Sequence, residues 1–435
     1  MDVHEVEMTG AAYGGSFVGR IEGKVVFVPF TATGEVVRVE VTEEKKSFST
    51  GAVVEVVSES SARVAPKCSV FGTCGGCSYQ HIEYSEQVRI KESIFLDSLR
   101  RIGGIVPECV EPSVEAAEPY GYRSRARIHV DGNRWGFYKV NSNTVVAIES
   151  CPLLDPLLNT LFKSIKKSIA EEPMPGLYEF EIGCSRDDGS TVARFYLDGK
   201  SPFDFEELLS SIEGLKGIEV WLKSGAELAS APARPIAAYG DTLSSYTVLG
   251  VSHLAPLGVF TQANTVENER LVDTVRRYAT EGCEGQGPLV IDLHCGSGNL
   301  TLALASGFER SVGVEASSTA VVAANNNAEE NGITSVEFIR SDSSQWLLSA
   351  AVKAKGLTDA VAVLDPPRGG DRASARALAE LGPKRILYVS CSPPTLARDL
   401  QAIAAKGYSC TKAVLIDMFP QTYHMESVVV MERQD

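Results

Sequence analysis

The chain has 435 residues, 44% of them hydrophobic, which is enough for two or three domains with separate cores. No apolar run reaches membrane-spanning length and the first residues lack the regions of a signal peptide, so we expect a cytoplasmic protein without membrane contact. The formal net charge of −15 excludes indiscriminate binding of polyanions, and ten unevenly spaced cysteines in a reducing compartment argue against disulfides.

The N-terminal part contains short β-type runs separated by glycine, such as Gly-Lys-Val-Val-Phe-Val-Pro-Phe and Gly-Glu-Val-Val-Arg-Val-Glu-Val. This rhythm predicts a small five-stranded barrel over residues 1–58. Barrels of this kind often bind RNA, and Arg20, Lys45 and Lys46 suit a phosphate backbone. Acidic neighbours dilute this patch, so an ordinary solvated face is the competing interpretation.

Cysteines with spacings typical of metal ligation come next: Cys68, Cys74, Cys77 and, far downstream, Cys151. Two of them are separated by two residues, glycines beside them let the backbone fold around a centre, and Pro152 follows the last. The pattern favours an iron–sulfur cluster. Zinc and the absence of a metal stay open as alternatives, because four thiolates also suit a structural zinc ion.

The central segment, residues 59–255, carries two further patterns. Apolar residues at helical spacing predict an amphipathic helix over residues 84–101, ended by a glycine pair. Arg123, Arg125 and Arg127 occupy alternate positions, so on a strand they would share one face. Three guanidinium groups in a row predict a track for RNA phosphates, and an exposed sheet face is the alternative.

Long alternation of strands and helices over residues 256–435 predicts a doubly wound α/β domain. Its successive strands end in polar residues: the turn Asp292–Asn299, then Glu315, Asp342, Asp365 and Cys391. Ligands of open α/β sheets bind outside the carboxyl ends of the strands, so these residues predict one site. Glu315 suits two ribose hydroxyls and Asp342 an adenine amino group. Thr301 replaces the third glycine of a dinucleotide fingerprint.

Cys391 is the candidate nucleophile. It lies between a buried strand and a helix that opens with two prolines, and a thiol at a helix N-terminus meets the positive end of the dipole, which favours the thiolate. A buried structural cysteine is the competing interpretation. Near the C-terminus, two apolar strands flank a turn with His424 and Glu426, and a hairpin there would fold Glu426 over the same edge of the sheet.

The chain also carries a set of specific motifs besides the four cysteines: Phe-Thr-Gln-Ala-Asn at 260–264, Asp-Leu-His-Cys-Gly-Ser-Gly-Asn at 292–299, Asp-Pro-Pro-Arg at 365–368, Ser-Cys-Ser-Pro at 390–393 and Phe-Pro-Gln-Thr-Tyr-His-Met-Glu at 419–426. Over essentially its whole length the chain thereby resembles the S-adenosylmethionine-dependent RNA uracil-5-methyltransferases. The likeness is to the TRAM-domain, iron–sulfur type that acts on 23S rRNA.

The resemblance implies a TRAM or OB-like barrel, a central α+β iron–sulfur domain and a C-terminal Rossmann-like methyltransferase domain, with S-adenosylmethionine and a 4Fe-4S cluster as cofactors. It implies that the helix over residues 84–101 packs on the catalytic domain. It further implies a cofactor and base site lined by Gln262, His294, Asn299, Glu315, Asp342 and Asp365. The family usually has Tyr or Phe at position 294, which leaves the role of His294 open.

The implied reaction is methylation of carbon 5 of a uridine in 23S rRNA. Because this carbon is a poor nucleophile, we expect Cys391 to add to carbon 6, Glu426 to remove the carbon 5 proton and Asp365 to position the base. The expected partner is RNA, and the chain is expected to act as a monomer. A tRNA T-loop uracil-5-methyltransferase and a non-catalytic iron–sulfur RNA-binding protein are the alternatives. A DNA cytosine-5-methyltransferase fits less well, because its nucleophile usually follows the strand that here carries Asp-Pro-Pro-Arg.

Overall fold

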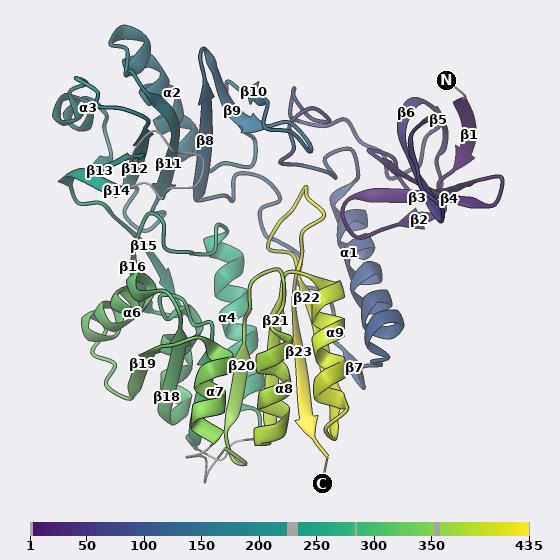
Figure 1. Cartoon of the computed structure of the whole chain (residues 1–435), viewed down its shortest axis with the longest axis vertical. Helices are drawn as coiled ribbons and strands as arrows, with labels where there is room; N and C mark the ends of the chain where they lie inside the picture. Colours follow the sequence, from purple (N-terminus) through teal and green to yellow (C-terminus); the bar gives the residue numbers. More distant parts are fainter. Residues whose placement is uncertain (1–2, 224–233, 283–284, 352–356, 435) are drawn as a thin grey trace.

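The computed structural model describes residues 3–223, 234–282, 285–351 and 357–434. Its strands form four sheets, and the parts of the chain follow one another from the N-terminal sheet through a central sheet to a large C-terminal sheet (Figure 1). No helix in these ranges is long and apolar enough to cross a membrane.

The N-terminal sheet consists of six short strands where the sequence predicted five. These are β1 (Val3–Glu7), β2 (Gly10–Ala11), β3 (Ser16–Ile21), β4 (Lys24–Pro29), β5 (Val36–Glu44) and β6 (Phe48–Ser58), in the order β1-β5-β6-β4-β3-β2. Alternate side chains such as Phe17, Val26 and Val28 are fully buried. This period of two places one face of every strand in a common core. The two-residue β2 pairs with β3 and is too short to be recognised from its sequence pattern.

Helix α1 (Tyr84–Ser98) and the π-helical turn Leu99–Gly103 follow the cysteine-rich segment. Glu83 caps the start by accepting the Glu86 N–H, and Gly104 ends the turn in the left-handed conformation with φ 63°. The helix and its turn contact α9 of the C-terminal domain (Figure 1). The helix therefore packs on the C-terminal domain, as expected, although its sequence lies between the N-terminal and central sheets.

The central sheet has the order β10-β9-β8-β11-β12-β13-β14. Its strands are β8 (Arg125–Asp131), β9 (Arg134–Tyr138), β10 (Val145–Ala147), β11 (Leu177–Cys184), β12 (Thr191–Leu197), β13 (Leu215–Leu222) and β14 (Arg234–Gly240). Helices α2 (Pro156–Glu171) and α3 (Phe205–Ser211) pack against it around a core that includes Phe162, Phe180 and Phe195. A hairpin of β15 (Leu243–Val248) and β16 (Val251–Pro256) leads into the C-terminal domain.

The C-terminal sheet has eight strands in the order β19-β18-β17-β20-β21-β23-β22-β7. They are β7 (Cys109–Val110), β17 (Gly287–Leu293), β18 (Phe308–Glu315), β19 (Val336–Arg340), β20 (Val361–Leu364), β21 (Arg385–Ser390), β22 (Tyr408–Ile416) and β23 (Glu426–Arg433). The strands from β19 to β21 are parallel, and β23 runs antiparallel between β21 and β22. The chain first builds β18 and β19 on one side of β17 and then β20 and β21 on the other, which makes a topological switch point beside β17.

Helices cover both faces of this sheet. They are α4 (Thr265–Thr280), α5 (Asn299–Leu304) with a 3₁₀ turn (Ala305–Gly307), α6 (Ser318–Glu330), α7 (Ser343–Ala351), α8 (Arg372–Leu381) and α9 (Pro393–Ala404). α7, α8 and α9 lie side by side over one face, and α4 packs behind β21 and β23 (Figure 1). All of β20, and β21 after its first residue, are buried between these helices, in agreement with the predicted doubly wound architecture.

Candidate functional site at the carboxyl edge of the sheet

The polar residues predicted at the strand ends meet at one edge of the C-terminal sheet. Each of β17, β18, β19, β20 and β21 ends at, or within two residues of, one of these side chains: His294, Glu315, Asp342, Asp365 and Cys391. Because these strands are parallel neighbours, their carboxyl ends lie along one edge, at the switch point where open α/β sheets bind ligands. The negative charges of Asp371, Glu315 and Asp365 all favour the protonated form of His294.

The turn after β17 is built for close approach of its backbone. Gly296 and Gly298 adopt φ 56° and 91°, and Gly298 is the N-cap of α5. The Gly296 N–H donates to Glu315 Oε2 at 3.2 Å, and the Ser317 N–H donates to the other oxygen, Oε1, at 2.8 Å. Glu315 is thus held at the rim of the glycine turn by two backbone groups, where it can accept further hydrogen bonds from a ligand.

Thr301, where a dinucleotide fingerprint has glycine, has a polar partner in the core. Its hydroxyl donates to Asp292 Oδ2 at 2.5 Å, while Asp292 Oδ1 has no hydrogen-bond partner among the described residues. Burial raises the pKa of Asp292 to about 7. Thr301, which stands in place of the glycine, therefore supplies a hydrogen-bond donor to the buried carboxyl group of Asp292. The spacing of the motif did not predict this contact.

His294 is anchored by a residue that the sequence did not single out. Its Nε2 lies 2.8 Å from Oδ2 of Asp371, the N-cap of α8. Burial opposes a charge on the ring, but the hydrogen bond and charge of Asp371 prevail and raise the pKa of His294. Burial likewise opposes the Asp371 charge, yet hydrogen bonds from His294 and Ser374 lower the pKa of Asp371 to about 2. Asp371 was not among the predicted site residues, and only the structure shows its contact with His294.

The other predicted cofactor residues lie around this edge with defined partners. Asn299 exchanges two side-chain hydrogen bonds of 2.9 Å with Asn268 of α4. Asp342 is exposed and accepts from the Gln345 N–H at 3.0 Å, at the start of α7. Gln262 is half-buried in the segment before α4. Asn299 is therefore directed at α4, whereas Glu315 and Asp342 are bordered by exposed positions.

Cys391 lies at the predicted junction of β21 and α9, but its acidity differs from the expectation. Burial, and next the charge of Glu426, raise the pKa of the Cys391 thiol to about 12, while the Arg368 guanidinium opposes this shift. Burial and the two nearby carboxyl groups therefore act against the thiolate that the helix N-terminus was expected to favour. The thiol needs a base or a bound substrate to ionise.

Glu426 occupies the place predicted for it. The β22–β23 hairpin brings it to the same edge, where only 3% of the residue is exposed and Oε1 has no partner among the described residues. Burial and the charge of Asp365 raise the pKa of Glu426 well above its usual range, and burial raises the pKa of Asp365 to about 7. Arg368, whose Nη2 lies 3.4 Å from His424 Nε2, is the cation beside these carboxyl groups. The site thus joins a thiol, two carboxyl groups and a guanidinium.

The four predicted metal ligands line one small cavity of about 40 Å³: Cys68, Cys74, Cys77 and Cys151. Hydrogen-bond donors face two of the sulfurs, from the Gly76 N–H to Cys74 at 3.4 Å and from Gln80 Nε2 to Cys77 at 3.2 Å. Within the described ranges, no three His, Cys, Asp or Glu side chains stand close enough together to hold a metal ion. The fold thus places the four thiols around one cavity, but their spacing does not form a binding site for a single metal ion.

The predicted arginine track differs from the expectation. Arg125 and Arg127 lie on β8, but Arg125 Nη1 donates to the Val259 carbonyl at 2.6 Å and Arg127 pairs with Glu181 on the neighbouring strand β11. These partners neutralise or occupy guanidinium groups that we expected to be free for phosphate. Arg127 keeps half of its side chain exposed and, with Arg123 and Arg125, borders a groove of about 350 Å³.

The C-terminal domain is Rossmann-like: its sheet is doubly wound, with a glycine turn after the first strand, an acidic residue at the end of the second and an antiparallel strand near the C-terminus. The site at its carboxyl edge suits a nucleoside cofactor. Residues 254–434 match the family model described as tRNA (uracil-5-)-methyltransferase, and residues 2–54 match the TRAM domain. The chain belongs to this family of S-adenosylmethionine-dependent RNA uracil-5-methyltransferases and carries an N-terminal TRAM domain.

Relatives match over nearly their whole length. A 23S rRNA (uracil(1939)-C(5))-methyltransferase RlmD of Alkalilimnicola ehrlichii is 35% identical, over 99% of this chain and 96% of that protein. An uncharacterized RNA methyltransferase of Thermosynechococcus vestitus is 34% identical, over 98% and 97%. The crystal structure of the Pyrococcus abyssi tRNA (uracil-54, C5)-methyltransferase with S-adenosyl-L-homocysteine has a TM-score of 0.77 and 23% identity, over 99% of this chain and 100% of that one. This last likeness extends the shared fold over the whole chain.

Proposed function

We propose that this protein methylates carbon 5 of a specific uridine in 23S rRNA through a covalent adduct on Cys391. The observation that carries the proposal is the meeting of Cys391, Glu426, Asp365 and Arg368 at the carboxyl edge of the sheet. The relatives named as RlmD act on 23S rRNA and support that substrate. We propose further that the chain acts as a monomer in the cytoplasm.

In the proposed reaction the Cys391 sulfur forms a bond to carbon 6 of the uracil, and the resulting enolate makes carbon 5 nucleophilic. S-adenosylmethionine supplies the methyl group that carbon 5 takes up; Gln262, His294, Asn299, Glu315 and Asp342 would line its site. Glu426 then accepts the proton from carbon 5, and the bond between sulfur and carbon 6 breaks. Asp365 and Arg368 hold the polar edge of the base. The target uridine has to leave its stack to expose carbon 6.

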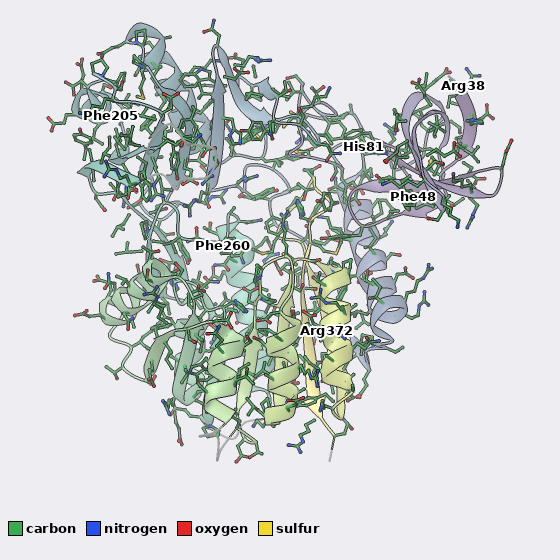
Figure 2. The ribbon with its side chains drawn as sticks, in the orientation of Figure 1. Arg38, Phe48, His81, Phe205, Phe260 and Arg372 are labelled. Carbon is green, nitrogen blue, oxygen red and sulfur yellow. The ribbon has the colours of Figure 1, made fainter. Side chains whose placement is uncertain are left out.

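RNA would reach this edge between the central and C-terminal sheets. Phe260 lies there with 73% of its surface exposed, beside the groove bordered by Arg127 (Figure 2). An exposed aromatic ring and guanidinium groups suit the stacked bases and phosphates of a single strand. With the TRAM domain, this supports RNA as the partner of an otherwise acidic protein.

The substrate is tested by incubating anaerobically purified protein with S-adenosylmethionine and separate unmodified 23S rRNA and tRNA transcripts. Quantifying 5-methyluridine by mass spectrometry after digestion is expected to give signal in 23S rRNA alone. Signal in tRNA alone would retain the chemistry and replace the substrate by the T-loop alternative. Signal in neither, from protein that binds S-adenosylmethionine, would favour a non-catalytic RNA-binding protein.

Methylation is expected to accelerate as the pH rises through neutrality. Cys391 and Glu426 both act in their deprotonated forms, and burial raises the pKa of each. Arg368 lowers both pKa values, so Arg368→Gln should displace the rising limb to higher pH. Single-turnover rates from about pH 6 to 9 check this, since the rising limb reports the pKa values of essential groups. A flat profile in both proteins would contradict the assignment of these two groups.

We propose that the four-cysteine cavity holds a 4Fe-4S cluster. Thiol donors and the N–H groups directed at Cys74 and Cys77 suit thiolate ligands. Cys77→Ser is expected to lose most of the iron and sulfide of the anaerobically purified protein. S-adenosylmethionine binding should persist, because the strand ends that would hold it are separate from this cavity. The exposed Cys109, changed to serine, is the matched control. Stoichiometric zinc in place of iron would overturn the proposal.

A further inference from the structure

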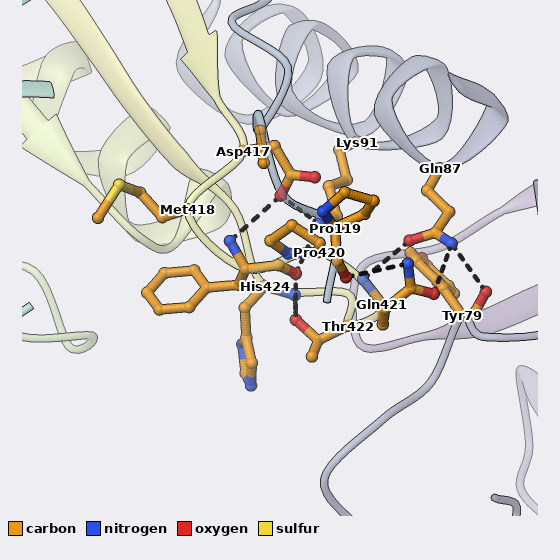
Figure 3. Close-up of polar contacts among 12 residues, drawn as sticks. Tyr79, Gln87, Lys91, Pro119, Asp417, Met418, Pro420, Gln421, Thr422 and His424 are labelled. Carbon is orange, nitrogen blue, oxygen red and sulfur yellow. Dashed lines mark hydrogen bonds and ion pairs between the residues drawn. The ribbon is translucent and has the colours of Figure 1, made fainter. Parts of the chain in front are cut away.

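The segment that joins β22 to β23, residues 417–425, ends at Glu426 and is held from outside the catalytic sheet. Helix α1, which lies in the N-terminal half of the sequence, presents polar side chains to it, and several hydrogen bonds and an ion pair join the two (Figure 3). The proposed chemistry assigns no role to α1. These contacts therefore need a separate explanation.

Lys91 of α1 makes a fully buried ion pair with Asp417. Its Nζ lies 2.6 Å from Asp417 Oδ1, both side chains have zero exposure, and it also donates to the Phe419 carbonyl at 3.0 Å. The second Asp417 oxygen accepts from the Tyr84 hydroxyl at 3.0 Å. A buried charge is tolerated only when it is paired and hydrogen-bonded in this way, so Lys91 fixes the start of the segment.

Gln87 of α1 holds the middle of the segment. Its Oε1 accepts from the Gln421 N–H at 2.9 Å, and its Nε2 donates to Gln421 Oε1 at 3.0 Å. The same Nε2 also donates to the carbonyls of Tyr79 and Ile82, at 3.1 and 2.8 Å. Gln421 adopts φ 68°, a left-handed conformation that a residue with a Cβ rarely takes without such support. Gln87 thus stabilises a backbone geometry that the segment alone would not favour.

These two anchors lead directly to the carboxylate proposed as the base. Asp417 follows Ile416, the cross-strand partner of Glu426 in the last rung of the hairpin. Thr422, which donates to the Phe419 carbonyl at 2.8 Å, accepts from the His424 N–H at 3.2 Å. A shift at either anchor would therefore displace the chain that enters Glu426. Cys391 follows the end of β21 and lies outside this segment.

We propose that Gln87 and Lys91 are positioning residues for the general base, acting through residues 417–425 on Glu426. The inference rests on the proposed function and deepens it. Glu426 acts after the Cys391 adduct has formed and been methylated. Loosening the segment should therefore slow release of the product more than formation of the adduct. A merely structural helix would affect both steps, and cofactor binding, together.

The test uses the full-length protein with Gln87→Met and, separately, Lys91→Met, in single-turnover reactions with S-adenosylmethionine and the 23S rRNA transcript. Denaturing gels measure the covalent protein–RNA adduct, and mass spectrometry measures released 5-methyluridine. We expect product release to fall on the order of a hundredfold, as for other small misplacements of a reacting group, while the adduct persists. Lys91→Arg, which keeps the positive charge, should restore much of the release rate. Ile94→Ala, on the same buried face of α1, controls for lost stability.

Parallel losses of adduct, release and S-adenosylmethionine affinity in Gln87→Met and Lys91→Met would overturn the inference and leave α1 a structural support. The inference would also be overturned if Ile94→Ala retained as much covalent adduct, with product release slowed as much, as Gln87→Met and Lys91→Met. Wild-type protein that makes no 5-methyluridine would instead overturn the proposed function, so the two failures are distinguishable. Melting temperatures of all variants show whether each protein is folded when it is assayed.

Discussion

Replacing Cys391 by alanine is expected to lower methyl transfer by at least about 10⁴-fold, since removing a covalent nucleophile eliminates the reaction path itself. The covalent protein–RNA adduct should disappear with it. S-adenosylmethionine should still bind, because the other strand ends that would hold it lie on β17, β18 and β19. Methyl transfer from labelled S-adenosylmethionine, denaturing gels and calorimetry measure these three quantities.

Cys410→Ala is the matched control for this substitution. Cys410 is also a buried cysteine of the C-terminal sheet, but it lies within β22, away from the carboxyl ends of the parallel strands. The Cys410→Ala protein should lose some stability, because the substitution leaves a small cavity in the core, and it should keep its methyl transfer activity. Turnover by Cys391→Ala at the rate of the control would refute covalent catalysis and leave the strand-end residues as a binding site only.

The carboxyl edge of the sheet could be predicted because its chemistry follows from topology. Parallel strands end side by side, so the polar residues that end or follow five successive strands had to converge. The turn between two apolar strands likewise predicted a hairpin that returns Glu426 to this edge, and β23 of that hairpin pairs with β21. The pKa of Cys391 could not be predicted from motif spacing, because it depends on burial and on carboxyl groups at the ends of β20 and β23.

The buried polar face of α1 could not be predicted from periodicity. Apolar spacing located the helix, but Gln87 and Lys91 resemble ordinary surface residues until their partners are known. Those partners lie 334 and 326 residues further along the chain, so only the tertiary structure brings them together. The arginines of β8 illustrate the converse error: their alternation was recognised, whereas Glu181 on β11, the acid that pairs with Arg127, was not.

Glu426→Gln is expected to separate the two halves of the reaction. The amide has nearly the same shape but cannot take the carbon 5 proton, so turnover should fall by about 10²- to 10⁴-fold, the range for a lost general base. The adduct should nevertheless form, because Cys391 adds to carbon 6 before Glu426 acts, and the amide fills the same buried place without adding a charge. Methylated RNA should therefore accumulate on the protein in denaturing gels.

The control for this trap is Glu432→Gln, at the far end of the same strand. Glu432 pairs with Arg385 at 2.5 Å and has a third of its side chain exposed, so its loss should affect stability slightly and the adduct not at all. If Glu426→Gln released fully methylated product at the wild-type rate, another base would have to remove the proton from carbon 5. Asp365, whose charge acts on both Glu426 and Cys391, would then be the carboxyl group to test, because burial raises its pKa to about 7. A trapped adduct in Glu426→Gln, together with none in Cys391→Ala, would establish that these two residues act in sequence on the same base.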